Sequence, residues 1–232
     1  MQKVYYTDWV SADIISLPEI RCKGESKLIT IIDYGAGNIR SIEKALQFIG
    51  EEVSLTGDPE KIRKAEKLVL PGVGSFGEAM ENLNRRHLTE AVREAAERQI
   101  PLLGICLGLQ LLFEKSDESP GVEGLGILKG EVLRIPDAPG LKIPHIGWNS
   151  LHLQNGGSLF RGIAEESYVY FVHSYYLKAA EEEIVKAVTD YGVQIHAAVE
   201  RGSVSATQFH PEKSSDVGLA ILRNFAAVGK GE

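Results

Sequence analysis

Short apolar runs alternate with helically spaced apolar residues along the first half of the chain. Runs with the length of buried strands occur at residues 28–32, 67–70 and 102–105. Between them, apolar residues recur every three or four positions over residues 39–49 and end at Gly50, and a second, highly charged helix is predicted near residues 88–98. This βαβα order predicts an α/β fold with a mostly parallel central sheet and helices on both faces.

The second half of the chain is richer in strand patterns. Extended or hairpin strands are predicted at residues 126–135, 168–172, 184–189, 193–199 and 203–209. Ser214 or Ser215 is predicted to cap a final helix that ends near Val228. Because no repeat, low-complexity tract or Pro/Gly-rich linker divides residues 28–232, we expect one domain, with its chemistry at the carboxyl edge of the sheet.

The composition of the chain narrows the possible functions. A net charge of −7 over 232 residues, without a cluster of Lys or Arg, argues against a nucleic-acid partner. The longest uncharged apolar stretch, residues 100–113, is too short to span a membrane. Two cysteines, Cys22 and Cys106, make no disulfide framework and suit a reducing cytoplasm. The six histidines show no metal-ligand spacing, so we expect no metal and no cofactor.

Cys106 lies in the sequence Gly-Ile-Cys-Leu-Gly-Leu-Gln, after an apolar run and before a helical pattern. This arrangement is typical of a strand-to-helix elbow with a nucleophile at its tip. The free N–H groups at the start of the following helix favour the thiolate. The alternative is a small buried core cysteine. It is disfavoured because Gly104 and Gly108 would weaken an ordinary strand or helix, and here they flank the one residue that needs room.

A histidine and a glutamate follow about a hundred residues later. His210 and Glu212 stand two positions apart around Pro211. In an extended segment that spacing places both side chains on one side. An imidazole oriented by a carboxylate is the partner that a nucleophilic thiol needs, so the three residues form a candidate catalytic set. A purely structural role for His210 is the alternative.

These motifs resemble those of the class I, triad-type glutamine amidotransferases, whose nucleophile elbow reads G-x-C-x-G-x-Q and whose base motif reads H-P-E. Five segments also occur in the order expected for the glutaminase subunits of imidazole glycerol phosphate synthases: DYGAGN at 33–38, PGVG at 71–74, PHIGWN at 144–149, YFVHSYY at 170–176 and HPEKS at 210–214. The resemblance runs from about residue 28 to the C-terminus. It implies a flavodoxin-like α/β fold.

The resemblance also implies a role for each motif residue. Cys106 attacks the side-chain carboxamide of glutamine, His210 is the base, and Glu212 orients the imidazole. Backbone N–H groups of Val73 and Leu107 are expected to stabilise the oxyanion that develops. The residues expected to contact the remainder of the glutamine are Gly72, Gly74, Gln110, Ser174 and Tyr175.

The loop at residues 33–38 has more than one interpretation. Two glycines between a strand and a helix suggest a phosphate loop, but the third glycine of a dinucleotide motif and a G-K-[ST] sequence are missing. Asn38 is instead predicted to cap the helix at 39–49. By resemblance, Asn38, Trp148, Tyr170 and Lys213 face a partner subunit. The alternatives are half-buried core positions for the aromatic residues and a solvated surface charge for Lys213.

The family's reaction implies an enzyme that hydrolyses glutamine to glutamate. The ammonia passes, within a heterodimer, to a (β/α)₈-barrel cyclase subunit that forms imidazole glycerol phosphate and AICAR in histidine biosynthesis. The chain has no room for that barrel, so the cyclase must be a separate subunit. Three alternatives remain: a glutaminase subunit for another acceptor pathway, a stand-alone γ-glutamyl cysteine hydrolase, and a non-catalytic regulatory subunit. The H-x-G-W-N motif argues against the first and the complete triad against the last.

Residues 1–27 precede the resemblance and carry no targeting pattern. Codons for Lys23-Gly24-Glu25 can spell a ribosome-binding sequence ahead of Leu28, and a leucine codon can start translation in bacteria. One hypothesis is that native translation starts at residue 28 and that residues 1–27 are a misassigned extension. The other is that residues 1–27 form an added surface arm.

Overall fold

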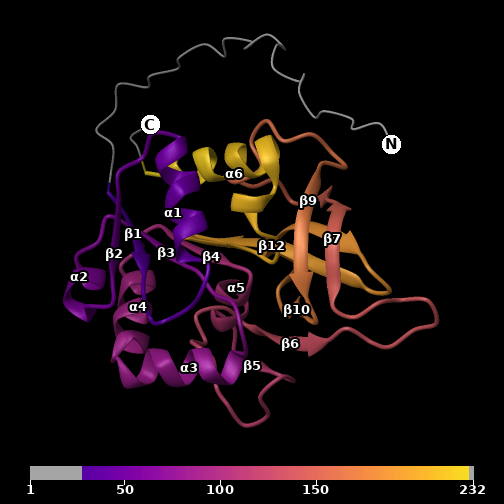
Figure 1. The fold of residues 1–232 in the computed structure, drawn as a ribbon, viewed down its shortest axis with the longest axis horizontal. Coiled ribbons are helices and arrows are strands. Elements are labelled where there is room, and N and C mark those ends of the chain that lie inside the picture. The colour runs from indigo at the N-terminus through magenta and orange to yellow at the C-terminus, as the bar shows by residue number, and fades with distance from the viewer. Residues whose placement is uncertain (1–27, 230–232) are drawn as a thin grey trace, which may run out of the picture.

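A computed structural model of the chain describes residues 28–229. The hypotheses on residues 1–27 therefore concern a segment outside the described residues. One large sheet forms the centre of the fold (Figure 1). Its eight strands are, in spatial order, β2 (Val53–Thr56), β1 (Ile29–Ile32), β3 (Lys67–Leu70), β4 (Leu102–Ile105), β13 (Val204–Thr207), β12 (Gln194–Arg201), β11 (Val185–Asp190) and β8 (His152–Leu153).

The central sheet is parallel from β2 to β13 and antiparallel at the other edge. β2, β1, β3, β4 and β13 run in one direction, whereas β12, β11 and β8 pair antiparallel. β13 comes late in the chain but lies directly beside β4, so that Thr207 pairs with Ile105 at their carboxyl ends. The segments that follow these two strands, one beginning with Cys106 and one leading to His210, therefore leave the sheet at the same edge.

Six α-helices and two short 3₁₀ helices occur within the described residues. They are α1 (Ile39–Phe48), α2 (Pro59–Arg63), α3 (Phe76–Arg85), α4 (Leu88–Glu97), α5 (Leu107–Leu111), α6 (Ser215–Ala227), η1 (Glu182–Ile184) and η2 (Pro211–Lys213). None of these helices is both long and apolar enough to cross a membrane.

The helices cover both faces of the sheet. In Figure 1, α1 and α6 lie on one side of β1, β3 and β4, and α3 and α4 lie on the other. The strand residues alternate accordingly: Val69 packs in the cluster that includes α1 and α6, while Leu68 and Leu70 pack in the cluster that includes α3 and α4. Because both of their faces are buried, the inner strands β1, β3 and β4 are apolar at nearly every position rather than at every second one.

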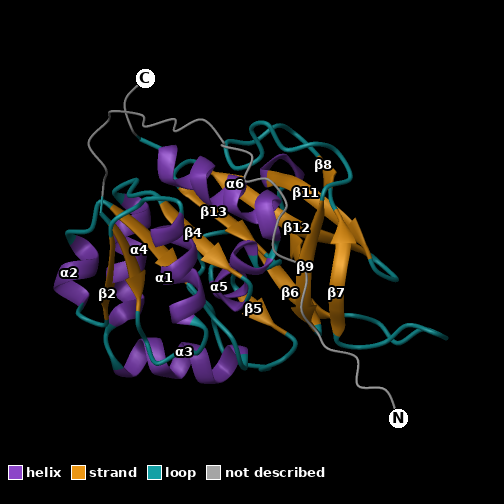
Figure 2. Cartoon of the chain, turned by 45° about the horizontal axis from the view of Figure 1, so that its top comes forward, coloured by secondary structure: helices purple, strands orange, loops and turns teal. Residues whose placement is uncertain are grey.

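Two smaller sheets extend the strand-rich half. One contains β10 (Tyr175–Ala179), β6 (Gly130–Arg134) and β5 (Lys115–Ser116), and the other is the antiparallel pair β7 (His145–Ser150) and β9 (Tyr168–His173). Figure 2 shows β7 and β9 beside the end of the central sheet. The residues of β9 alternate between a buried face and a half-exposed or exposed one, as expected of a sheet covered on one side only, whereas in β7 only His145 is buried.

The predicted α/β fold with a mostly parallel sheet is confirmed, with corrections to its elements. The strand predicted at residues 126–135 begins only at Gly130, and the one predicted from residue 184 begins after η1. The sequence pattern did not predict α2, α3, β2, β5, β7, β8 or β10. Two of these have weak patterns for physical reasons: α2 has five residues, and β7 exposes Ile146 and Trp148 on its uncovered face.

Lys67 is a fully buried lysine at the start of β3. Its Nζ donates hydrogen bonds to the backbone carbonyls of Phe225, at 3.5 Å, and of Ala226. These carbonyls belong to the last turn of α6, where helical partners are missing and the helix dipole is negative. The Lys67 side chain, at the start of an otherwise apolar strand, thus supplies hydrogen-bond donors to backbone carbonyls at the end of α6 on one face of the sheet.

Candidate active site

Cys106 lies at the turn between β4 and α5. Its backbone is in an unusual left-handed conformation, with φ 55° and ψ −108°. Hydrogen bonds hold this conformation, because the N–H of Cys106 donates to the carbonyl of Thr207 at 2.7 Å and its carbonyl accepts from Leu109 at 3.0 Å. The predicted strand-to-helix elbow is therefore present. The following helix has only five residues, so its dipole is weaker than that of a full-length helix.

The two glycines of the elbow are required by backbone packing. A Cβ atom at position 108 would lie 1.9 Å from the carbonyl oxygen of Leu70, and one at position 104 would lie 2.9 Å from the carbonyl oxygen of Gly108. From the sequence, these glycines were expected to provide the space that the thiol needs. The structure corrects this reason: they let α5 pack against the ends of β3 and β4, beneath the thiol.

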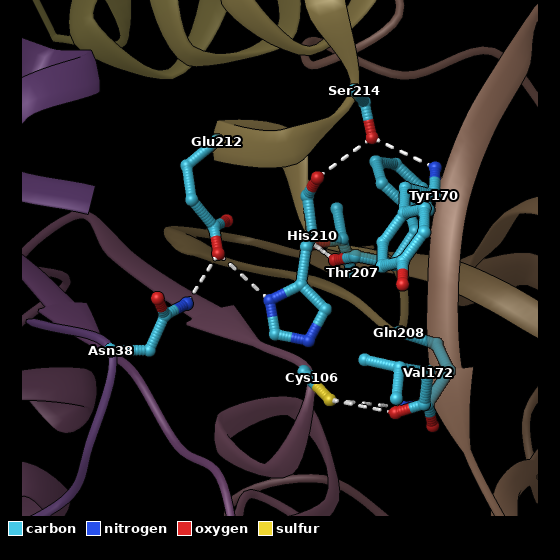
Figure 3. Close-up of polar contacts among 10 residues, drawn as sticks. Asn38, Cys106, Tyr170, Val172, Thr207, Gln208, His210, Glu212 and Ser214 are labelled. Atoms are coloured by element: carbon cyan, nitrogen blue, oxygen red, sulfur yellow. Dashed lines mark hydrogen bonds and ion pairs between the residues drawn. The ribbon is translucent and has the colours of Figure 1, made fainter. Parts of the chain in front are cut away.

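His210 and Glu212 form a buried pair beside Cys106 (Figure 3). Nδ1 of His210 is 2.8 Å from Oε1 of Glu212, and both side chains are almost fully buried. Nε2 of His210 points towards Cys106 and has no hydrogen-bond partner among the described residues. The segment is not extended as expected, because Pro211–Lys213 forms a 3₁₀ turn, and this turn brings the carboxylate back to the imidazole.

The electrostatics of the site favour a charged imidazole. Burial by itself lowers the pKa of His210, but its interactions with Cys106 and Glu212 outweigh burial and raise that pKa to about 9. The imidazolium therefore persists at neutral pH beside the sulfur of Cys106. Because the pKa is above the unfolded value of about 6.5, this interaction contributes stability that is fully present below about pH 6.5 and is lost as the pH rises through about 9.

Gln208 is a second neighbour of the sulfur that sequence reasoning did not identify. Its Nε2 lies 3.8 Å from Sγ of Cys106, and Sγ is 3.9 Å from the carbonyl oxygen of Val172. The carboxamide oxygen of Gln208 accepts from Nε2 of Gln110 at 3.1 Å. The available signal was position: Gln208 is a polar residue at the end of a buried strand, two residues before His210.

A pocket of about 300 Å³ opens beside the thiol. It brings together the predicted oxyanion and glutamine-binding residues, except Gly72. Its lining residues are Val73, Gly74, Cys106, Leu107, Gln110, Glu118, Pro144, Val172, His173, Ser174, Tyr175 and His210. A Cβ atom on Gly72 would lie 2.7 Å from the Tyr34 hydroxyl and 2.8 Å from Cβ of Leu107, so this glycine packs behind the pocket wall.

Two buried histidines support the pocket wall opposite the elbow. Nδ1 of His173 is 2.9 Å from the carbonyl oxygen of Tyr175, and its Nε2 is 3.1 Å from Nδ1 of His145. Burial lowers the pKa of His173 to about 3 and that of His145 to about 4. Both rings are therefore neutral, and His173 must donate from Nδ1 and accept at Nε2. The hydrogen bonds of His173 to the Tyr175 carbonyl and to His145 therefore hold the turn that carries Ser174 and Tyr175.

Two predicted helix caps, Asn38 and Ser214, stand at the expected positions but make no capping hydrogen bond. Asn38 precedes α1 but makes no side-chain hydrogen bond to it; its Nδ2 donates to Oε1 of Glu212 at 2.6 Å. Its backbone is left-handed, with φ 68°, which differs from the extended conformation of a capping residue. Ser214 likewise makes no capping hydrogen bond to α6. Its hydroxyl donates to the His210 carbonyl at 2.7 Å and accepts from the N–H of Tyr170 at 3.0 Å.

The other residues predicted to face a partner gather near the site. Trp148 is 52% exposed and packs edge-on against Tyr170, with ring centroids 6.1 Å apart. Nζ of Lys213 lies 5.9 Å from the centroid of the Tyr170 ring.

Among residues 28–229, no cluster of three or more His, Cys, Asp or Glu residues has the arrangement of a metal site.

Comparisons with known proteins agree on one family. The model of the family "Glutamine amidotransferase class-I" matches residues 30–228. The chain is 52% identical to imidazole glycerol phosphate synthase subunit HisH of Moorella thermoacetica, over 85% of this chain and 93% of that one. It is 50% identical to the protein of the same description from Methanothermobacter thermautotrophicus, over 87% and 98%.

Solved structures show the same fold at lower sequence identity. A crystal structure of a glutamine amidotransferase superposes with a TM-score of 0.68 and 22% identity, over 86% of this chain and 99% of that one. A structure of PurLQS from Thermotoga maritima superposes with a TM-score of 0.67 and 23% identity, over 85% and 96%.

Proposed function

We propose a function from one premise: this chain belongs to the class-I glutamine amidotransferase family. It is the glutaminase subunit of an imidazole glycerol phosphate synthase and acts in histidine biosynthesis. The observation that carries this function is the convergence of Cys106, His210 and Glu212 at one edge of the sheet, in a chain half identical to synthase subunits over most of its length.

We propose that the three residues cleave the carboxamide of glutamine in two steps. The thiolate of Cys106 attacks the amide carbon while His210, as imidazolium, holds the proton that the thiol has lost. When the tetrahedral intermediate collapses, the C–N bond breaks and His210 gives its proton to the departing nitrogen, which leaves as ammonia. Water then hydrolyses the thioester to glutamate and restores the thiol. Glu212 holds the imidazole in the required tautomer.

Two backbone donors support the proposed oxyanion site. Leu107 is the first residue of α5, where an N–H has no acceptor within the helix. Val73 lies across the pocket, on the loop that follows β3. Both border the space beside Cys106, where the carbonyl oxygen of a bound glutamine would become negative.

Other residues of the pocket suit the α-amino and α-carboxylate groups of glutamine. Gly74, Ser174 and Tyr175 line this space, as does Gln110, whose Nε2 already donates to Tyr175 and Gln208. Gln110 therefore organises the wall and offers its carboxamide oxygen to a ligand. Glu118 also lines the pocket, and its carboxylate is suited to an ammonium group.

We further propose that the outer face of β7 and β9 docks a (β/α)₈-barrel cyclase subunit, which receives the ammonia. Ile146, Trp148 and Tyr168 are 52–59% exposed there, and Lys213 lies beside Tyr170. Rigid aromatic residues on an exposed face are suited to anchor an interface. The complex would act in the cytoplasm, in keeping with a sequence that has only two cysteines. The amidotransferase domain would comprise residues 28–232, with residues 1–27 as a preceding extension.

A reconstitution experiment tests the function. The full chain is mixed with the barrel subunit of a synthase from a close relative, its acceptor substrate and glutamine, and the formation of imidazole glycerol phosphate is measured. We expect product only when both subunits and glutamine are present. Amidotransferase partners that act on other acceptors serve as controls. Product formation with such a partner, and none with the cyclase, would assign the chain to another pathway.

Replacing Glu212 by glutamine should lower glutaminase turnover without unfolding the protein. The amide has nearly the same shape, but it neither stabilises the imidazolium nor enforces the tautomer. The comparable change in a serine-protease triad costs about 10⁴-fold, and we expect a loss between about tenfold and that value, because a thiol needs less help from its base than a hydroxyl. The measurement is kcat for glutamate release by the complex. Turnover within about twofold of wild type would remove Glu212 from the catalytic set.

A further inference from the structure

The Glu212 carboxylate is held from two sides. Its Oε1 atom accepts a hydrogen bond from Nδ1 of His210 at 2.8 Å and another from Nδ2 of Asn38 at 2.6 Å (Figure 3). Asn38 lies on the loop between β1 and α1, 174 residues before Glu212. Because a carboxylate can only accept, Asn38 must present its NH₂ group, which fixes the orientation of its amide.

Burial makes this second hydrogen bond important. The Glu212 side chain has no exposed surface, and its other oxygen, Oε2, has no hydrogen-bond partner among the described residues. A buried carboxylate is costly unless donors compensate for the water it has lost. Asn38 supplies one of the two hydrogen bonds that the structure assigns to this group. Without the hydrogen bond from Asn38, rotation of the carboxylate towards water and away from His210 becomes more favourable.

The loop that carries Asn38 is itself firmly placed. The buried hydroxyl of Tyr34 donates to the carbonyl of Pro71 at 2.9 Å, which ties the start of the loop to the segment behind the pocket. Burial and the charge of Cys106 raise the pKa of Tyr34, so it remains a donor. At the other end, the left-handed backbone of Asn38 is one that asparagine tolerates better than most residues. The amide therefore reaches Glu212 from a fixed base.

We propose that Asn38 is a positioning residue of the glutaminase site: its amide holds the Glu212 carboxylate against Nδ1 of His210 and so keeps Nε2 directed at Cys106. This role rests on the proposed function and adds a fourth residue to the set that prepares the thiolate. It differs from the helix cap and from the contact with a partner that the sequence suggested for the same residue.

The proposal makes the state of His210 depend on Asn38. The titratable groups that act on His210 are Cys106 from the elbow, Glu212 from η2, and the neutral His173 from β9. If the carboxylate moves away, the pKa of His210 falls below its value of about 9 and less imidazolium remains at neutral pH. The sulfur of Cys106 then lies beside a ring that is less often charged in the same pH range.

Two substitutions separate the amide from the backbone conformation. Asn38→Gly keeps a left-handed backbone without strain but removes the donor, and Asn38→Asp replaces the donor with a carboxylate that repels Glu212. His87→Gly is the matched control, because His87 also precedes a helix with a positive φ of 56°, makes no side-chain cap, and is exposed, whereas Glu212 is fully buried.

The first readout is alkylation of Cys106 by iodoacetamide in the isolated full chain, which needs neither glutamine nor a partner. The rate is followed by mass spectrometry of the Cys106 peptide, with the Cys22 peptide of the same digest as the reference. At pH 7 we expect Asn38→Gly to react about tenfold more slowly than wild type and Asn38→Asp more slowly still. The difference in alkylation rate between the variants and wild type should become smaller above about pH 9, where an ordinary thiol is ionised without a neighbouring cation. His87→Gly should react like wild type.

The second readout is kcat for glutamate release by the complex, which should fall in the same order, while a circular dichroism spectrum like that of wild type shows that Asn38→Gly still folds. If Asn38→Gly matched wild type in alkylation rate and kcat, the asparagine would serve only its backbone conformation and the proposal would fail. Normal alkylation with impaired synthesis by the complex would overturn it in favour of a partner contact. If wild type itself released no glutamate, the proposed function would fail, whereas the alkylation series would still decide the role of Asn38.

Discussion

Replacing Cys106 by alanine should abolish glutamine-dependent formation of imidazole glycerol phosphate by the reconstituted complex. The thioester cannot form without the sulfur, so no ammonia is released from glutamine. Added ammonium salts should restore synthesis to within about twofold of wild type, because the thiol makes ammonia but takes no part in the cyclase step. Cys106 is a small, 7% exposed residue, and removal of its sulfur leaves the glycine packing of the elbow unchanged.

The design includes a matched control. Cys22→Ala removes the other cysteine and should leave glutamine-dependent synthesis intact, which excludes a general effect of thiol loss. The measurement is the initial rate of product formation with glutamine or with ammonium chloride as nitrogen source. If ammonium failed to rescue Cys106→Ala although the barrel subunit was active with wild type, the proposed division of labour between the subunits would be wrong.

Local sequence patterns predicted the parts of the site that lie close together in the chain. The elbow around Cys106 was recognisable because two glycines interrupt an apolar run at fixed positions, and the backbone contacts of Gly108 explain why they must. The pairing of His210 and Glu212 was recognisable from their spacing, although the turn that joins them was misjudged. The parallel sheet followed from apolar runs that are buried on both faces.

Contacts between distant segments could not be predicted in this way. Asn38 is of a residue type that often caps helices, and it directly precedes α1. Only the fold places its amide against a carboxylate 174 residues away. Gln208 reads as one more residue of a strand until β13 is placed beside β4, which brings it to the sulfur. Lys67 likewise interrupts the apolar sequence of β3. Its hydrogen-bond partner is the carbonyl of Ala226 in α6, near the end of the chain.

The largest regulatory effect is expected at Val73. We predict that the isolated subunit is a poor glutaminase and that the barrel subunit with its acceptor substrate raises the rate of glutamate release at least about tenfold. Val73 is 40% exposed at the pocket rim, and its neighbour Gly74 has φ 99°, a conformation that glycine adopts at little cost. A peptide that turns its N–H away from the pocket removes one oxyanion donor, which is worth about 10²–10³ in turnover. Acceptor binding need only bias that peptide between two states.

Two substitutions at this position test the mechanism. Val73→Pro removes the N–H and should abolish the rise in glutaminase rate on adding partner and acceptor. Val73→Ala keeps the N–H and shortens a side chain that is already exposed, so it should retain most of the rise. Steady-state glutamate release is measured for each variant alone, with the partner, and with the partner and acceptor together. Full activation of Val73→Pro would exclude this N–H from the oxyanion site. Equal wild-type rates with and without the liganded partner would favour a stand-alone hydrolase. In such an enzyme both backbone N–H donors would already face the pocket in the absence of a partner.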